Sequence, residues 1–116
     1  MSKMPLFVEL PSFEQYREDY LNDDKFRELQ KILTDNPKAG PRMKGTGGLR
    51  KVRYSDPKRN KGKRGGVRVI YYYLKTKNEF LLFTLYGKIE ATDLTEKEKT
   101  IFKKALKEEL KARKYE

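Results

Sequence analysis

The sequence predicts one α+β domain over residues 1–116. The expected element order is β-α-α-β-β-β-α, with the helices packed on one face of a small twisted, mainly antiparallel sheet. A chain of 116 residues is long enough for one hydrophobic core and too short for two. Helical periodicity occurs twice near the N-terminus and once at the C-terminus, and three β-prone runs lie between them. Eight tyrosines and six phenylalanines argue against disorder, although 39% of the residues are charged.

A strand and a short helix are expected at the N-terminus. Residues 6–10 form an apolar run that ends at Pro11. Ser12 is the predicted N-cap of the helix, and Gln15 stands where it closes a capping box. The aromatic residues of this helix share one face and are expected in the core: Phe13, Tyr16 and Tyr20.

A second helix and a glycine-containing loop follow. The helix is expected to begin at Asn22 or Asp23 and to end before Pro37. Residues 37–48 contain four glycines and predict a loop. They lack the spacing of a phosphate-binding P-loop, so their glycine-rich end predicts a tight turn into the next strand. The apolar face of the helix consists of Phe26, Leu29, Ile32 and Leu33.

Three β-prone runs predict an antiparallel meander over residues 49–54, 67–74 and 80–86. The last two runs are apolar enough to be central strands with two covered faces. Residues 75–78 between them predict a hairpin turn.

The C-terminal segment predicts a final helix with a polar face made mostly of lysine. Either Asp93 or Thr95 caps this helix, with Glu96 or Glu98 at its third position. Its apolar stripe consists of Ile101, Phe102, Ala105, Leu106 and Leu110.

Nearly all of the excess positive charge lies between residues 42 and 68. This stretch contains eleven basic residues and one acid, so it carries ten of the eleven net positive charges. Charge concentrated in so short a stretch predicts a binding surface for a polyanion. A basic loop that contacts only solvent is the alternative interpretation.

The composition excludes several classes of site. The chain has no cysteine and no histidine, so it has no disulfide, no thiolate metal ligand and no cysteine nucleophile. We expect no metal and no cofactor. No apolar run approaches the roughly 20 residues of a membrane span, and the N-terminus does not resemble a secretory signal. A cytoplasmic protein is therefore expected.

Basic residues on neighbouring strands form the candidate catalytic set. Lys51 and Arg53 share one face of their strand, Arg68 begins the next strand, and Lys88 follows the third. Neighbouring strands lie about 4.8 Å apart. We therefore expect these four side chains to converge on the face of the sheet that the helices leave open.

Such a patch suits single-stranded RNA. Arginine forks match phosphate oxygens, and Tyr72 and Tyr86 offer rings on which unpaired bases can stack. RNA also carries its own nucleophile, the 2′-hydroxyl group. A lysine crowded by other cations is a plausible base for that hydroxyl, and an arginine stabilises the charge that develops on phosphorus. The residues alone leave binding and cleavage both open.

Three segments carry a resemblance to a known family. Residues 45–53, 62–72 and 85–90 have the sequences GTGGLRKVR, GKRGGVRVIYY and LYGKIE. In this order and spacing they resemble the RelE/ParE toxin superfamily, and most of all its HigB-type branch. The likeness extends over nearly the whole chain, including the early helix pair and the final helix. It implies a RelE-like fold and a toxin of a type II toxin–antitoxin pair, which cuts messenger RNA in the ribosomal A site through the transcript's own 2′-hydroxyl.

The resemblance also assigns roles by position. Lys51 stands where relatives place a base or a contact to the scissile phosphate, and Arg53 supports it. Arg68 stabilises the transition state, and Lys88 stabilises the leaving group or gives it a proton. Relatives often have a C-terminal tyrosine near the site, whereas a longer helix ends this chain.

Further residues are expected to bind RNA and the ribosome. The basic loop after residue 57 is expected to hold ribosomal RNA by its backbone, in a salt-sensitive manner. A flexible linker without specific contacts is the alternative for this loop. The predicted RNA-binding and ribosome-binding set consists of Arg50, Lys58, Arg59, Lys61, Lys63, Arg64, Tyr72 and Tyr86.

The resemblance implies three partners: the 70S ribosome, messenger RNA and an antitoxin. The antitoxin is expected to be HigA-like, with a helix-turn-helix domain, and to bind through an amphipathic helix or an added strand. Two other functions remain open. One is an RNA-binding module without toxicity, and the other is a ParE-like poison of DNA gyrase.

Overall fold

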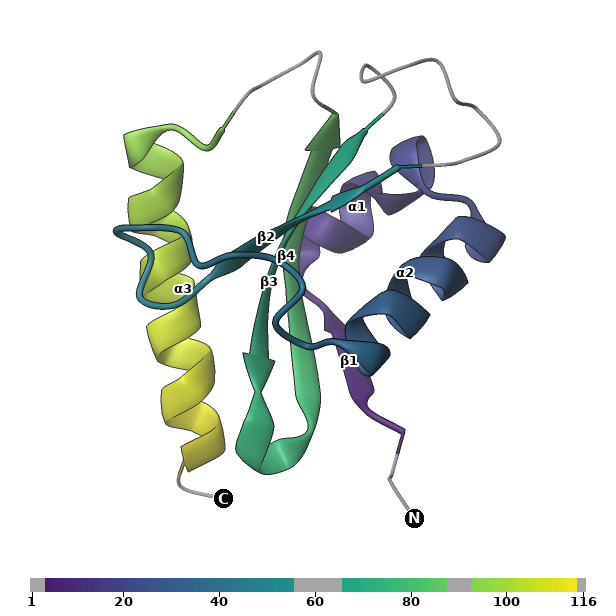
Figure 1. Ribbon diagram of the computed structural model, residues 1–116. Coiled ribbons are helices and arrows are strands. Elements are labelled where there is room, and N and C mark those ends of the chain that lie inside the picture. The colour runs from purple at the N-terminus through teal and green to yellow at the C-terminus, as the bar shows by residue number, and fades with distance from the viewer. Residues whose placement is uncertain (1–3, 56–65, 88–92, 115–116) are drawn as a thin grey trace.

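The chain forms a four-stranded mixed sheet and three α-helices within the residues that the computed structural model describes, 4–55, 66–87 and 93–114 (Figure 1). The expected α+β class and order of elements are confirmed. The helices are α1 (Pro11–Tyr20), α2 (Asp23–Asp35) and α3 (Glu96–Lys114). The strands are β1 (Leu6–Glu9), β2 (Arg50–Tyr54), β3 (Val67–Leu74) and β4 (Glu79–Gly87).

The sheet has the strand order β1-β4-β3-β2. Strands β2, β3 and β4 form the expected antiparallel meander. A 3₁₀ turn (Lys75–Lys77) joins β3 to β4, and Asn78 follows it in the left-handed conformation with φ of 50°. Strand β1 pairs with β4 in parallel, with Leu6 opposite Glu79, and forms one edge of the sheet. The chain therefore places its first strand beside its last one.

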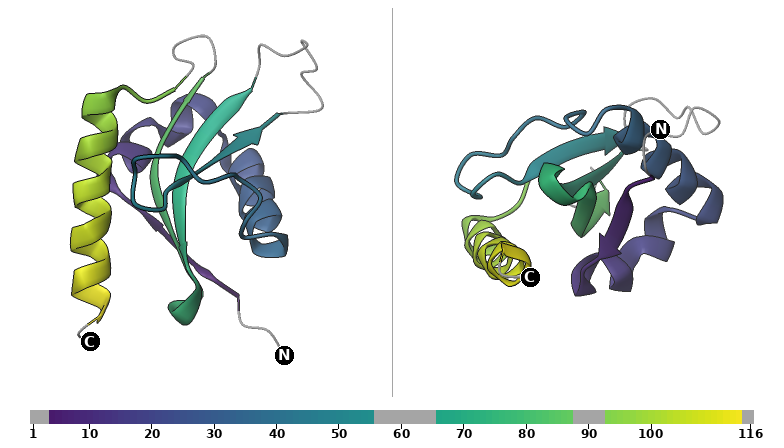
Figure 2. Two further views of the ribbon diagram at one scale, coloured as in Figure 1. Left: turned by 60° about the vertical axis from the view of Figure 1, so that its left-hand side comes forward. Right: turned by 90° about the horizontal axis from the view of Figure 1, so that it is seen from below.

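Helices cover both faces of the sheet, which corrects the expectation that all of them lie on one face. Figure 2 shows α3 on the opposite side of the sheet from α1 and α2. Val69 and Tyr71 of β3 are buried against α1 and α2, whereas Ile70 is buried in a second cluster with Leu106 of α3. Because apolar side chains alternate to both faces of β3, a bare second face would expose them at a cost of about 25 cal/mol per Å². The final helix removes that cost.

Helix α1 starts differently from the prediction. Its N-cap position is Leu10, which makes no side-chain cap bond, and Pro11 occupies the first turn. Proline favours this position because its fixed φ suits a helix start and it has no N–H to satisfy. Ser12 is therefore inside the helix, and its hydroxyl lies 2.8 Å from the hydroxyl of Thr84 on β4. The Ser12 capping box is wrong, and this side chain connects α1 to the sheet instead.

The other two predicted helix starts are confirmed. The side chain of Asn22 accepts a hydrogen bond of 2.8 Å from the backbone N–H of Lys25. At α3, Glu98 donates its backbone N–H to the hydroxyl of Thr95 over 3.1 Å, and the Glu98 carboxylate accepts from the Thr95 N–H over 2.8 Å. This capping box fixes where the last helix begins, and so it fixes the position of the segment just before it.

The loop between α2 and β2 is fixed to the sheet by Tyr71. The Tyr71 hydroxyl accepts a hydrogen bond from the N–H of Gly40 over 3.1 Å and donates one to the carbonyl of Pro37 over 2.7 Å. Burial raises the pKa of Tyr71, so the hydroxyl keeps its proton. The N–H of Lys51 also donates to the carbonyl of Pro41 over 3.1 Å. The loop thus lies along β2 as an added edge and then reaches across to α3 (Figure 1).

Among the described residues, no helix combines the length and the hydropathy that crossing a bilayer requires.

Candidate functional site

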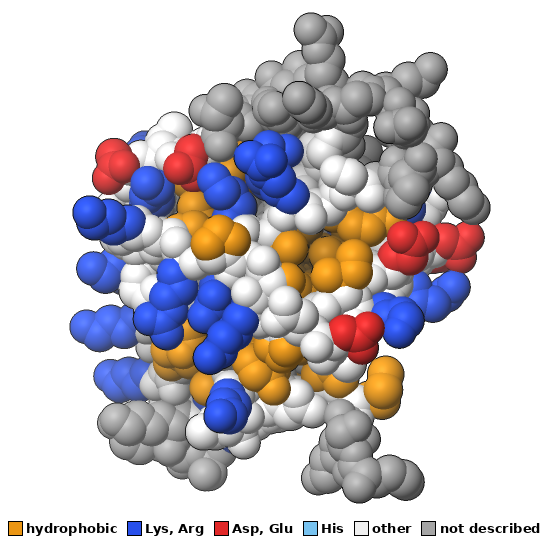
Figure 3. Space-filling model, viewed as in Figure 1, with side chains coloured by type: hydrophobic (Ala, Val, Ile, Leu, Met, Phe, Trp, Pro, Cys, Tyr) orange, Lys and Arg blue, Asp and Glu red, His pale blue; other side chains and the backbone are white. Residues whose placement is uncertain are grey.

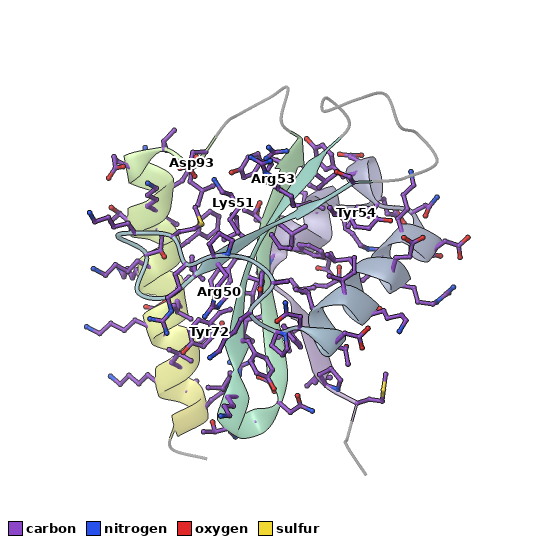
Figure 4. The ribbon with its side chains drawn as sticks, in the orientation of Figure 1. Arg50, Lys51, Arg53, Tyr54, Tyr72 and Asp93 are labelled. Atoms are coloured by element: carbon purple, nitrogen blue, oxygen red, sulfur yellow. The ribbon has the colours of Figure 1, made fainter. Side chains whose placement is uncertain are left out.

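Three of the four predicted catalytic cations lie on one face of the sheet. In the ladder of β2 and β3, Arg53 is directly opposite Arg68, and Lys51 is opposite Ile70. Val52, which lies between Lys51 and Arg53, is buried against α1 and α2, so its two neighbours point to the α3 face. Figure 4 shows Lys51 and Arg53 close together along β2. The structure therefore brings Lys51, Arg53 and Arg68 together.

Arg53 and Arg68 form a cross-strand pair of like charges. Side chains directly opposite each other on antiparallel strands have Cβ atoms about 4.5–5.5 Å apart, and like charges there are destabilising. Arg53 is exposed, whereas Arg68 is only 5% exposed. Within residues 4–55, 66–87 and 93–114, no carboxylate forms an ion pair with either one. A buried arginine opposite a second arginine is an arrangement that a bound anion stabilises.

Gly66 makes room for the guanidinium of Arg68. A Cβ atom at Gly66 would lie 2.8 Å from Nη1 of Arg68, closer than van der Waals contact allows. The absence of a side chain at residue 66 therefore lets the arginine lie along the start of β3. The sequence pattern around residue 66 did not indicate this packing role.

Asp93, in the segment just before α3, lies beside Lys51 and completes the site. Its carboxylate lies 3.6 Å from Nζ of Lys51 and accepts a hydrogen bond of 2.8 Å from the backbone N–H of Leu94. Both partners of the ion pair are partly exposed, with Lys51 at 27% and Asp93 at 46%. The sequence pointed to Asp93 only as a helix cap. No local pattern shows that residue 93 folds back onto residue 51.

Tyr86 of β4 lies beside Arg68 and within the electrostatic influence of Asp93. It is the cross-strand partner of Arg68, and its hydroxyl is buried without a hydrogen-bond partner among the described residues. Burial, together with the negative charges of Asp93 and Glu98, raises the pKa of Tyr86 to about 12, although the positive charge of Arg68 lowers it. The hydroxyl is therefore neutral at physiological pH. It is a candidate hydrogen-bond donor in the site, not a base.

Replacing Tyr86 by phenylalanine is expected to stabilise the free protein by about 1 kcal/mol, because a buried hydroxyl without a partner carries an uncompensated desolvation cost. The raised pKa adds a dependence on pH. Between pH 10 and about 12 the unfolded tyrosine ionises and the folded one does not, so the wild-type protein loses stability there and the variant does not share that loss. Urea unfolding of both proteins at pH 7 and across this range measures the effect. Equal stability at pH 7 would show that the hydroxyl has a partner.

A cavity opens beside Tyr86, between α1 and the start of α3. It has a volume of about 290 Å³, and its wall includes Tyr86, Asp93 and Glu98. Tyr16 and Ser12 of α1 line the opposite side. The cavity is therefore rich in hydroxyl and carboxylate groups, in contrast to the cationic surface of β2 next to it.

The remaining predicted residues divide into two groups. Arg50 donates a hydrogen bond of 2.8 Å to the carbonyl of Gly40, and Tyr72 is half-buried with Gly48 packed against its ring. Tyr72 is four residues along β3 from Arg68, or roughly 13 Å at 3.3 Å per residue. The predicted residues outside the described part of the chain are Lys58, Arg59, Lys61, Lys63, Arg64 and Lys88.

Figure 3 shows many basic side chains on the face that carries β2, with few acidic ones among them. The described residues contain no group of three or more potential histidine, cysteine, aspartate or glutamate metal ligands. The site offers charged and hydroxyl groups for an anionic substrate. These groups suit proton transfer and charge stabilisation at a phosphodiester.

Comparison with known proteins identifies the fold. No protein-family model matches the sequence. Among solved structures, a mutant of the E. coli toxin RelE in its free state is similar, with a TM-score of 0.50 and 12% sequence identity. The match covers 78% of this chain and 90% of that chain. At this level of identity the likeness concerns the arrangement of the backbone, and the chain therefore has a RelE-like fold.

Proposed function

We propose that this protein is the toxin of a type II toxin–antitoxin pair and an endoribonuclease of the HigB type, which cleaves messenger RNA in the ribosomal A site. The observation that carries the proposal is the pairing of Arg53 with Arg68 across β2 and β3, with Lys51 on the same face. On a RelE-like fold, this set is suited to a phosphodiester. A toxin that acts by binding gyrase would not need two arginines held opposite each other.

The proposed reaction is an attack by the RNA on itself. The 2′-hydroxyl oxygen forms a bond to the adjacent phosphorus, and the bond from phosphorus to the 5′-oxygen breaks. The products are a 2′,3′-cyclic phosphate and a free 5′-hydroxyl group. The reaction consumes no water, because the attacking oxygen belongs to the RNA. Proton removal from the 2′-hydroxyl and proton delivery to the leaving oxygen are the two steps that side chains must assist.

The site offers groups for these steps. Lys51 and Asp93, 3.6 Å apart, supply an amine and a carboxylate next to the position proposed for the scissile phosphate. Arg68, with Arg53 opposite, stabilises the additional negative charge on phosphorus. Lys88 is proposed to assist the leaving oxygen, by its position after β4. The ribosome would hold the transcript in line for attack, which explains how so few side chains suffice.

The proposed partners follow from the same assignment. Besides the 70S ribosome and messenger RNA, we expect a HigA-like antitoxin with a helix-turn-helix domain. Its inhibitory segment is proposed to carry acidic residues, because it must neutralise the exposed cationic face of β2 that the RNA would otherwise occupy. Toxin and antitoxin together are then expected to bind their own promoter.

Controlled expression of the wild-type protein is expected to stop growth and to produce messenger RNA fragments with 5′-hydroxyl ends inside translated codons. Mapping of 5′ ends in cells, with and without a block of translation, measures this directly. Cuts that persist when translation is blocked would show that cleavage does not require the ribosome. Salt-dependent RNA binding with neither cuts nor growth arrest would favour a non-catalytic RNA-binding module, and inhibition of purified gyrase would favour a ParE-like poison.

A further inference from the structure

Two neighbouring pockets lie at the end of β3 that extends past β2. The ladder between β2 and β3 ends where Arg50 faces Tyr71, so the rest of β3 continues beyond it. Each pocket has a volume of about 250 Å³, and Tyr72 lines both of them. Together they fall within the roughly 300–1,000 Å³ that is typical of small-ligand sites.

The first pocket is strongly cationic. Four of its lining residues are basic: Lys38, Arg42, Arg50 and Lys75. Its described lining contains no carboxylate, and none of the four forms an ion pair with a described acidic residue. Arg50 is held in place by its bond to the carbonyl of Gly40. Four cations in one concavity repel each other, and an anion bound between them relieves that repulsion.

The second pocket is more apolar. Leu74 of β3 and Leu110 of α3 line it beside Tyr72. Its polar lining residues are Thr76, Lys77 and Arg113, and Arg113 already forms ion pairs with Glu79 and Glu109. Gly48 packs against the Tyr72 ring, because a Cβ at residue 48 would lie only 3.2 Å from Cε1 of that ring. The ring is therefore held in position between the cationic pocket and the apolar one. Figure 4 shows Tyr72 and Arg50 together in the middle of the face that carries β2.

We infer that these two pockets bind one nucleotide of single-stranded RNA, with its phosphate in the cationic pocket and its base against Tyr72 in the apolar one. A nucleotide has these two parts, an anion and a flat ring, joined by one sugar. An acidic peptide would satisfy the cations and leave the apolar pocket unused, and a duplex keeps its bases stacked inside the helix. The inference rests on the proposed function in that RNA is taken as the substrate. It places a second contact on the transcript, away from the scissile phosphate.

The test is equilibrium binding of a fluorescent hexaribonucleotide with 2′-O-methyl groups, which the protein cannot cleave, measured by anisotropy from about 50 mM salt upward. R42A/K75A is expected to weaken binding about tenfold and to lower the salt slope by about 0.7, the value for one phosphate contact on a single strand. Tyr72→Leu is expected to weaken binding about fivefold or more, and Tyr72→Phe to bind like wild type. Lys104→Ala, at an exposed lysine of α3 outside both pockets, is the matched control.

The outcomes separate this inference from the proposed function. Wild-type affinity in both R42A/K75A and Tyr72→Leu would overturn it, as would failure of the wild-type protein to bind the hexanucleotide at low salt. If the wild-type protein nevertheless arrests growth and cuts messenger RNA, the proposed function stands without a nucleotide site in these pockets. If the pocket variants weaken RNA binding but the protein cuts no RNA, the nucleotide site is supported and the proposed endoribonuclease activity is wrong. Tighter binding of an acidic peptide than of the hexanucleotide would assign the pocket to a protein partner.

Discussion

Replacing Arg68 by methionine is expected to reduce RNA cleavage by at least about 100-fold while the protein remains folded. Arg68 would supply a fixed positive charge to the transition state, and removal of one such preorganised group typically costs about 100- to 1,000-fold in rate. Methionine keeps the length of the buried stem, so the side chain still fills its place at 5% exposure. Single-turnover cleavage on programmed ribosomes gives the rate, and thermal unfolding reports the fold.

The unfolding temperature of this variant is expected to equal or exceed that of the wild type, because the change removes one of two like charges that face each other on β2 and β3. Arg53→Met removes the other charge and serves as the matched control. Arg53 is exposed, so we expect a smaller loss of rate, about tenfold. An Arg68→Met protein that cleaves at the wild-type rate would contradict the assignment of this site.

Replacing Gly40 by alanine is expected to destabilise the protein by about 3 kcal/mol, the upper end for overpacking. The new Cβ would lie 2.6 Å from both the carbonyl carbon and the carbonyl oxygen of Lys51, and 2.8 Å from the N of Val52. These are backbone atoms of a strand that is paired with β3, so they cannot move aside as a side chain can. Urea unfolding measures the loss, and reduced cleavage is expected because Lys51 shifts with β2.

Gly45→Ala provides the comparison within the same loop. Gly45 has a φ of 79°, so alanine there is strained by about 1 kcal/mol, but a Cβ meets no atom within 4 Å. Gly40→Ala is therefore expected to cost clearly more than Gly45→Ala. Equal costs would mean that the loop can move away from β2 and does not set the position of Lys51.

Local rules in the sequence predicted most of the fold. Asn22, and Thr95 with Glu98, occupy cap positions whose side chains bond backbone groups a few residues away, and such short-range geometry is readable from spacing. The alternation of β2 also placed Lys51 and Arg53 on one face. The convergence with Arg68 then followed from the meander, because consecutive antiparallel strands pair in a simple order.

The features that the sequence did not reveal depend on contacts between distant segments. Ser12 has the chemistry of a cap, yet Pro11 begins the helix one residue earlier and Ser12 bonds Thr84 instead. Asp93 lies near Lys51 because α3 crosses the second face of the sheet, and a one-dimensional pattern does not show which face a helix covers. The same limit hid the parallel pairing of β1 with β4, since both edges of a meander are open to a fourth strand.

The buried hydroxyl of Tyr71 has a consequence for the length of RNA that the protein covers. It bonds the loop that carries Lys38 and Arg42, and its own strand carries Arg68 toward one end and Tyr72 toward the other. The two places where a transcript would be held are therefore parts of one rigid body, and the span between them is constant. A strand of RNA that occupies both must bridge that span with a fixed number of nucleotides. The protein would therefore cleave at a constant distance, counted in nucleotides, from the nucleotide held at Tyr72.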